Sequence, residues 1–135
     1  MTEARDWKYL TLDRNDRVLT VTFKSGHRVN SLNNALMREL TQLALDLQQD
    51  SELSAIILTG TADMFSAGMD LKDPESPNAR DLSVAERRTL VKVGPTMCAA
   101  WEALEPVTIC AIEGWCIGGG AALAVSCDWR VIASD

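Results

Sequence analysis

Two glycine-containing turns could present backbone N–H groups to a reacting group. Three consecutive glycines occupy positions 118–120, between an apolar run and a run of small residues, in GWCIGGGAALAVSCD. Glycine costs conformational entropy inside a regular element, so three together indicate that another group approaches this backbone more closely than a side chain would allow. The second turn, MFSAGMDL at 64–71, follows the short apolar run at 53–60. Both turns could therefore offer N–H donors to a bound oxygen atom.

The spacing of these glycines does not fit the common nucleotide-binding or nucleophile motifs. A dinucleotide fingerprint needs glycines at i, i+2 and i+5, but counting from Gly118 places Leu123 at the last position. No Gly-Lys-Ser or Gly-Lys-Thr sequence follows, so a phosphate-binding P-loop is excluded. Ser66 resembles the serine of a nucleophile elbow, yet Met64 stands where that motif has its first glycine. The single histidine, His27, gives no spacing that supports a catalytic triad.

The elements expected around the turns form an alternating series of strands and helices. The expected strands cover 17–23, 53–60, 107–114 and 129–134. Such alternation predicts an α/β fold with a parallel sheet covered by helices. Parallel strands end at the same edge of a sheet, so the turns after the second and third of these strands should meet there. One N–H group from each turn would then make an oxyanion hole.

Three helices are expected between the strands. The first should start at Ser31, with Asn30 or Ser31 as its N-cap. Its apolar face is the set of leucines at 32, 36, 40, 43 and 47, which recur at steps of three and four. The second should start at Ser83 in the capping box SVAE, after a surface loop at 72–82, and Gly94-Pro95 should kink or split it. Its apolar stripe comprises Leu90, Val93, Met97, Trp101 and Leu104. The third helix is expected over GGAALAVSCD.

Composition argues against several classes of protein. The chain has 135 residues and a net charge of −6, with no apolar run of about 18 residues and a polar, acidic N-terminus. These features predict a single cytoplasmic domain with neither a membrane span nor general nucleic-acid binding. The four cysteines form no Cys-x-x-Cys pair, so we expect buried, reduced thiols and no metal site. They are Cys98, Cys110, Cys116 and Cys127.

Three motifs in this order resemble the crotonase, or enoyl-CoA hydratase/isomerase, superfamily: HRVNSLNNALMREL, FSAGMDL and GWCIGGGAALAVSCDWRVIASD. The resemblance covers the chain from about residue 8. It implies a fold built as a spiral of ββα turns, action on an acyl-CoA thioester in fatty acid metabolism, and assembly as a homotrimer or hexamer. Coenzyme A is part of the substrate, and no further cofactor is implied.

The same resemblance implies that residues 1–135 are the N-terminal portion of a single crotonase-type domain. Family members continue well past the point that matches Asp135, and this chain stops one residue after an expected strand. We therefore expect the fold to be incomplete at the C-terminus. The apolar faces of 107–112 and 129–134 should then lack part of their cover.

The resemblance also assigns the candidate oxyanion hole. Its donors would be the N–H groups of Met69 and Gly119, with Gly119 at the start of the third expected helix. The bound atom would be the thioester oxygen, which carries the developing negative charge of an enolate or a tetrahedral intermediate. This oxygen is the group whose close approach the glycines at 118–120 would permit.

Further residues are implied as contacts for coenzyme A or the substrate: Arg28, Ala67, Gly68, Asp70, Leu71, Lys72 and Gly118. The backbone around Ala67 and Gly68 would contact the adenine end. Arg28 and Lys72 stand where basic residues often meet the phosphates, with ordinary surface charges as the alternative. For Asp70 we favour a role in holding its own loop over proton transfer.

One position departs from the hydratase pattern. Hydratases of this family use two glutamates, and Ala122 stands where the first of them lies. Alanine has no proton to transfer, so the sequence favours an isomerase or another non-hydratase branch, such as a decarboxylase or hydrolase. The alternatives are an enoyl-CoA hydratase and a non-catalytic acyl-CoA-binding protein. Glu113 is interpreted as a rim residue or a structural acid.

Overall fold

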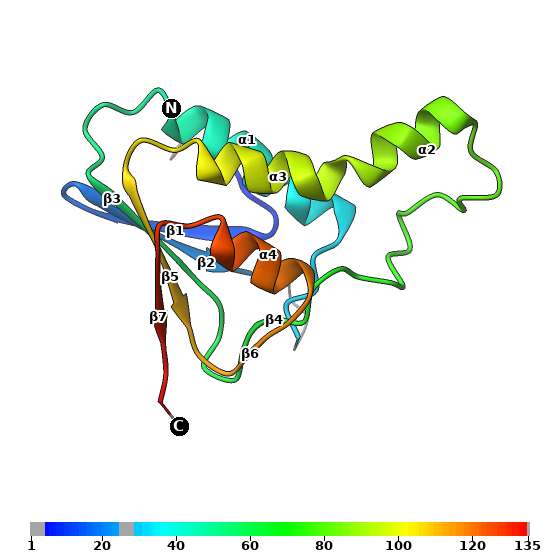
Figure 1. Cartoon of the computed structure of the whole chain (residues 1–135). Helices are drawn as coiled ribbons and strands as arrows, with labels where there is room; N and C mark the ends of the chain where they lie inside the picture. The colour runs from blue at the N-terminus through cyan, green and yellow to red at the C-terminus, as the bar shows by residue number, and fades with distance from the viewer. Residues whose placement is uncertain (1–4, 25–28, 135) are drawn as a thin grey trace.

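Strands and helices alternate along the chain in the computed structural model, which describes residues 5–24 and 29–134 (Figure 1). The strands are β1 (Leu10–Asn15), β2 (Val18–Phe23), β3 (Ala55–Thr59), β4 (Met64–Ser66), β5 (Val107–Ile112), β6 (Trp115–Cys116) and β7 (Trp129–Ile132). The helices are α1 (Asn34–Leu47), α2 (Val84–Val91), α3 (Val93–Glu102) and α4 (Gly119–Val125). The predicted α/β class is confirmed.

The main sheet has five strands in the order β1-β2-β3-β5-β7. Strands β2, β3, β5 and β7 run parallel to one another, as predicted. Strand β1 is antiparallel to β2. Strand β1 was not anticipated. It joins β2 through a tight turn in which Asp16 adopts a positive φ of 55°, a conformation that aspartate tolerates better than most residues.

Helix α1 begins three residues later than expected. Its N-cap is Asn33, whose side chain accepts a hydrogen bond of 2.7 Å from the Leu36 N–H. Asn30 is not the cap, because its φ of 46° is left-handed. Ser31 is not the cap because the next residue, Leu32, forms a β-bridge with Met69. The expected N-cap was therefore wrong, although Leu32 is buried like the helical leucines.

The second expected helix is divided into α2 and α3 at Lys92. Ser83 caps α2 through the predicted capping box with Glu86. The expected split occurs, but it lies just before Gly94-Pro95, which falls in the first turn of α3, where proline is tolerated. The third helix, α4, ends at Val125, before the end of the expected range.

A single hydrophobic core lies between one face of the main sheet and the helices α1, α3 and α4 (Figure 1). Side chains of β2, β3 and β5 alternate between buried and more exposed positions, so that one face of each strand enters this core. Met97 and Trp101 of α3 are 1% exposed, and the Trp101 indole N–H donates to the Leu40 carbonyl oxygen at 3.0 Å. None of the helices in the described segments is long and apolar enough to cross a membrane.

The last strand differs from the others because all four of its residues are exposed. Trp129, Val131 and Ile132 are each more than 60% exposed, as is Val125 on the neighbouring helix. The expected lack of cover is thus observed for β7. In β5 it is limited to Val107, which is 44% exposed.

One ion pair predicts a pH dependence of stability. Arg14 contacts the Asp50 carboxylate at 2.6 Å, and this hydrogen bond lowers the pKa of Asp50. A lowered pKa in the folded state stabilises the fold above the unfolded value of about 3.9, and the benefit is lost as the pH falls through the folded value. We expect Arg14→Gln to reduce the free energy of unfolding by about 0.2–1 kcal/mol at pH 7, because both groups are partly solvated.

Urea unfolding at several pH values would measure this difference, which should shrink as the pH falls below about 4. Arg17→Gln is a suitable control, because Arg17 donates to the uncharged Ser54 hydroxyl at 2.9 Å. A difference for Arg14→Gln that stays constant from pH 7 to pH 3 would contradict the assignment.

Candidate active site

The two glycine-containing turns meet in the structure. Strand β4 of the first turn pairs with β6 of the second in a small parallel sheet, and the Ile117 N–H donates to the Ser66 carbonyl oxygen at 3.0 Å. The two turns approach each other so closely that two positions, Gly68 and Gly120, have no space for a side chain. A Cβ atom on Gly120 would lie 2.8 Å from the Ser66 Cβ, and one on Gly68 would lie 2.7 Å from the Ile117 carbonyl oxygen.

The peptide group between Gly68 and Met69 has a defined orientation. The Gly68 carbonyl oxygen accepts a hydrogen bond of 2.8 Å from the Leu32 N–H. A trans peptide is planar, with its C=O and N–H pointing in opposite directions. The Met69 N–H must therefore point away from Leu32. It donates to no residue that the structure describes.

The peptide group between Gly118 and Gly119 is held in a similar way. The Gly118 carbonyl oxygen accepts from the Ala122 N–H at 3.0 Å within the first turn of α4. By the same planarity, the Gly119 N–H points outward from the start of the helix. Gly118 has a φ of 55° and a ψ of −119°, a combination that glycine adopts far more readily than other residues. Among the described residues, none accepts a hydrogen bond from the Gly119 N–H.

These two N–H groups belong to turns in direct contact. A Cβ atom on Gly119 would lie 3.5 Å from the Met69 nitrogen, and one on Gly68 would lie 3.0 Å from the Gly119 nitrogen. Each N–H is trans to a carbonyl that accepts a hydrogen bond, which polarises the peptide group and strengthens it as a donor. The arrangement leaves two neighbouring, fixed donors with no acceptor among the described residues.

The other residues predicted from the sequence lie around the first turn. The Ala67 N–H donates to the Val29 carbonyl oxygen at 2.9 Å. Asp70 holds its own loop, as expected, because its carboxylate accepts from the Lys72 N–H at 2.9 Å. Leu71 is 90% exposed, and the Lys72 side chain is also exposed. Arg28 lies outside the described residues.

Exposed apolar side chains stand beside the two donors on both turns. Met69 is 61% exposed and Ile117 is 48% exposed, one on each turn. Ala122 is exposed and lies three residues after Gly119, on the same face of α4. The exposed face of the helix next to the Gly119 N–H thus carries a methyl group where a proton-transferring side chain could stand.

None of the four cysteines offers an exposed thiol to this region. Cys110 and Cys127 are buried, Cys98 and Cys116 are half-buried, and all four are free thiols. A hydrogen bond to Cys127 and burial raise the pKa of Cys110, and burial raises the pKa of Cys116. A raised pKa keeps these two thiols neutral and unreactive. The hydrogen bond with Cys110 lowers the pKa of Cys127, whose thiol is buried. No cluster of metal-ligating side chains occurs among the described residues.

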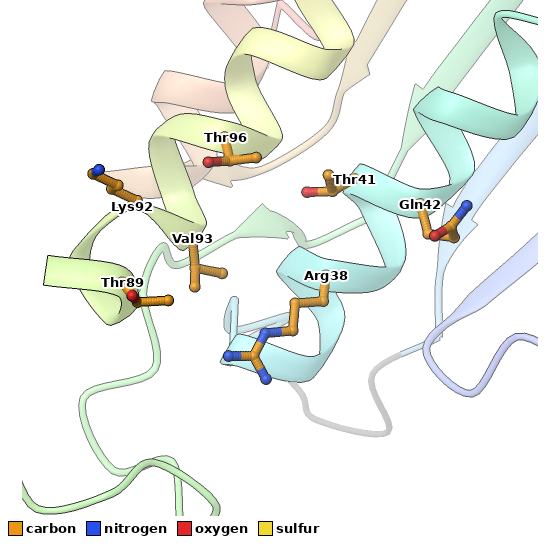
Figure 2. Close-up of a pocket in the computed structure, with 7 residues that line it drawn as sticks. All are labelled: Arg38, Thr41, Gln42, Thr89, Lys92, Val93 and Thr96. Carbon is orange, nitrogen blue, oxygen red and sulfur yellow. The ribbon is translucent and has the colours of Figure 1, made fainter. Parts of the chain in front are cut away.

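Two cavities adjoin the helices α1 and α2. One of about 480 Å³ lies between α1 and the junction of α2 and α3, and a second of about 460 Å³ adjoins it. The first is lined by Arg38, Thr41, Gln42, Thr89, Lys92, Val93 and Thr96. Its two cationic side chains come from different elements, Arg38 from α1 and Lys92 from the junction of α2 and α3 (Figure 2). Neither cavity includes Met69 or Gly119.

Sequence reasoning missed the buried polar groups that support the first turn. Ser66 is fully buried and Asn30 is 2% exposed. The Asn30 amide donates to the Met64 carbonyl oxygen at 3.0 Å. Both residues lie in the recognised motifs, but Ser66 was considered only as a nucleophile and Asn30 only as a helix cap. For Ser66 the available signal was a polar residue inside the apolar stretch MFSAGM, whereas Asn30 lies in a polar stretch that gave no such signal.

Comparisons with known proteins agree on one family. The family model "Enoyl-CoA hydratase/isomerase" matches residues 13–135. A Mycobacterium bovis protein named "Probable enoyl-CoA hydratase echA8" is 35% identical over 132 residues, covering 96% of this chain and 47% of that protein. The human protein named "Delta(3,5)-Delta(2,4)-dienoyl-CoA isomerase, mitochondrial" is 29% identical over 143 residues, covering 98% of this chain and 43% of that protein.

A solved structure matches as well. The enoyl-CoA hydratase from Bacillus anthracis superposes with a TM-score of 0.80 at 28% identity, over 93% of this chain and 47% of that one. The match confirms the expected crotonase-like fold. The chain spans about half the length of the curated relatives that it matches.

Proposed function

Because the chain belongs to the enoyl-CoA hydratase/isomerase family, we propose that it binds an acyl-CoA thioester with the thioester oxygen between the N–H groups of Met69 and Gly119. The observation that carries this proposal is the orientation of the two peptide groups. The Leu32 N–H holds one carbonyl and the Ala122 N–H holds the other, so both donors are fixed before the substrate arrives. Preorganised donors stabilise the charge that develops on the oxygen in the transition state.

We propose the remaining contacts for coenzyme A on the same basis. The residues are Arg28, Ala67, Gly68, Asp70, Leu71, Lys72 and Gly118. The exposure of Leu71 and Lys72 supports contact with a ligand that lies across the first turn. Asp70 would act by shaping the loop, since its carboxylate is engaged by the Lys72 N–H.

We propose that the reaction is isomerisation, or another conversion outside the hydratase branch. Ala122 supports this choice, because it lies on the same face of α4 as Gly119 and has no titratable group. The alternative is hydration, which the name of the Mycobacterium bovis relative favours. A non-catalytic acyl-CoA-binding protein is a further alternative, supported by the same absence of an acid at position 122.

Assembly is part of the proposal. The exposed apolar side chains of β7, with Val125 of α4, form a surface that water solvates poorly. We propose that this surface is covered in the assembled protein, which the resemblance expects to be a homotrimer or hexamer. Analytical ultracentrifugation would measure the assembly size.

Turnover of crotonyl-CoA and of 3-enoyl-CoA and dienoyl-CoA esters tests the proposal. We expect double-bond migration and only background hydration. Hydration by the wild-type protein at about 1–1000 per second, the ordinary range for enzymes, would contradict the isomerase preference. Binding of every ester without turnover of any would instead support the non-catalytic alternative.

Restoring an acid at position 122 should increase hydration. If Ala122 faces the reacting carbons, Ala122→Glu should raise crotonyl-CoA hydration by about 10²-fold, the lower range for a positioned general acid or base. Ala122→Gln is the matched control, since it has the same size but cannot transfer a proton in this way. Equal rates for the two variants would contradict the placement of Ala122 next to the substrate double bond.

A further inference from the structure

The buried hydroxyl of Ser66 connects the backbone of the first turn to the separate segment that contains Asn30. Its Oγ donates to the Asn30 carbonyl oxygen at 2.8 Å and accepts from the Gly68 N–H at 3.1 Å. The Ser66 side chain is fully buried, so it cannot contact a substrate. One of its hydrogen bonds joins it to Gly68, the residue before the candidate donor Met69, and the other joins it to the neighbouring segment at Asn30.

These bonds belong to a short ladder that joins two segments far apart in the sequence. The Ala67 N–H donates to the Val29 carbonyl oxygen, and the Asp70 N–H donates to the Leu32 carbonyl oxygen at 3.0 Å. Between these two rungs, Ser66 holds the N–H of Gly68 while the Leu32 N–H holds its carbonyl. Both peptide groups that flank the Gly68 α-carbon are therefore held in place.

Gly68 is the residue that most needs such restraint. Its φ of 88° lies in the region that glycine enters easily and other residues avoid. A glycine that is free to rotate about this angle would change the direction of the next peptide group, whose N–H belongs to Met69. Without the Ser66 hydroxyl, the buried Gly68 N–H and the Asn30 carbonyl would each lose a partner, which is unfavourable enough to drive a local rearrangement.

Ser66 also contacts the second turn. Gly120 packs against its Cβ and its carbonyl oxygen, both within 3 Å of where a Cβ on Gly120 would lie. The next residue back along the chain is Gly119, the other candidate donor. A side chain larger than serine would press on α4 at its first turn. Serine is small enough for this contact and still provides the two hydrogen bonds.

We propose that Ser66 is a positioning residue, whose hydroxyl bridges the Asn30 carbonyl and the Gly68 N–H and thereby aims the Met69 N–H at the thioester oxygen. This inference rests on the proposed function of the two N–H donors. It assigns Ser66 no covalent role, because its hydroxyl proton is engaged by the Asn30 carbonyl. Its contribution to catalysis is to keep one donor in the geometry that the transition state requires.

The test is an infrared measurement on the full protein with bound butyryl-CoA that carries carbon-13 at the thioester carbonyl. This ester is saturated, so it has no double bond to hydrate or move. Hydrogen bonds to the carbonyl oxygen lower its stretching frequency, so the shift on binding reports the donors directly. For the wild-type protein we expect a clear shift to lower frequency.

Ser66→Ala should lose about half or more of that shift and lower kcat about 10–100-fold, since a donor displaced by about 1 Å can cost 10²-fold. KM should change by less than about threefold, because the interaction acts mainly in the transition state. Ser66→Cys keeps a weak hydrogen-bonding group of similar size and should recover part of both losses. If Ser66→Ala does not fold, the shift in Ser66→Cys decides, and a reduced shift is expected.

Thr108→Val is the matched control. Thr108 is 2% exposed, and its hydroxyl makes two hydrogen bonds to Asp128, at the opposite end of β5 from the glycine-containing turns. Its removal should lower stability but leave the carbonyl shift unchanged. A full wild-type shift in a folded Ser66→Ala or Ser66→Cys protein would overturn the proposal for Ser66 alone. The absence of any shift in the wild-type protein with bound ester would overturn the proposed oxyanion hole, and the role of Ser66 with it.

Discussion

Replacing Gly68 with alanine should reduce turnover of the acyl-CoA substrate by about 10²–10³-fold, the loss typical for one oxyanion-hole donor. The added Cβ would lie 2.7 Å from the Ile117 carbonyl oxygen and 3.0 Å from the Gly119 nitrogen. Both contacts are with backbone, which cannot move aside as a flexible side chain can. The φ of 88° adds strain for any residue with a Cβ. The two turns would have to separate, and the two N–H groups could no longer share one oxygen.

Two other glycines provide controls for this result. Gly94 lies in α3, where a Cβ would approach only the flexible Met37 sulfur, at 3.8 Å. Gly94→Ala should therefore keep full activity. Gly118 has a φ of 55° but no atom within 4 Å of an added Cβ, so Gly118→Ala tests backbone strain without steric contact. Steady-state kinetics and thermal melting of the three variants would separate these effects. Near-wild-type turnover in Gly68→Ala would show that the two turns need not touch.

The parallel sheet and the meeting of the two turns were predicted from the local sequence. Strands β2, β3, β5 and β7 lie within the four runs in which strands were expected, and the parallel arrangement follows from the helices between them. The three strands that were not predicted, β1, β4 and β6, differ in how much signal the sequence contains for them. Strands β4 and β6 have three and two residues, which is too short to show an alternating pattern. Strand β1 was predictable, because Asn15 and Asp16 are typical turn residues between two alternating runs.

The long-range hydrogen bonds that support the candidate site could not be predicted from the local sequence. The hydrogen bond from Ser66 to Asn30 joins residues 36 positions apart, and that from Asn34 to Asp73 joins residues 39 apart. Local propensity carries no information about such pairs. The same is true of Leu32, whose spacing fits the helix face but whose backbone pairs with Met69. Tertiary pairing overrode the helical pattern at this point and moved the start of α1.

Replacing Trp101 with alanine should lower the free energy of unfolding by about 3–5 kcal/mol, the range for a buried tryptophan. Trp101 is 1% exposed and joins α3 to α1, where its indole N–H donates to the Leu40 carbonyl oxygen. Close packing of the surrounding core leaves little room to collapse into the space of the missing ring. Most of the loss should therefore come from the cavity and the lost apolar contact, with a smaller part from the hydrogen bond.

Urea unfolding of three variants would divide this loss into its parts. Trp101→Phe keeps most of the ring volume and removes the N–H donor, so it should cost less than Trp101→Ala, with about 0.5–1.5 kcal/mol due to the hydrogen bond. Leu45→Ala changes a residue of α1 that is 47% exposed, and it should alter stability by about 0.5 kcal/mol or less. A loss below about 1 kcal/mol in Trp101→Ala would contradict the packing of α3 on α1, since it is far below the range for buried tryptophan.

Because Trp101 lies on the side of α3 that faces α1, away from the two N–H donors, kcat of the folded Trp101→Ala protein should remain near the wild-type value. Stability and catalysis should thus respond to different residues, Trp101 for the first and Gly68 for the second.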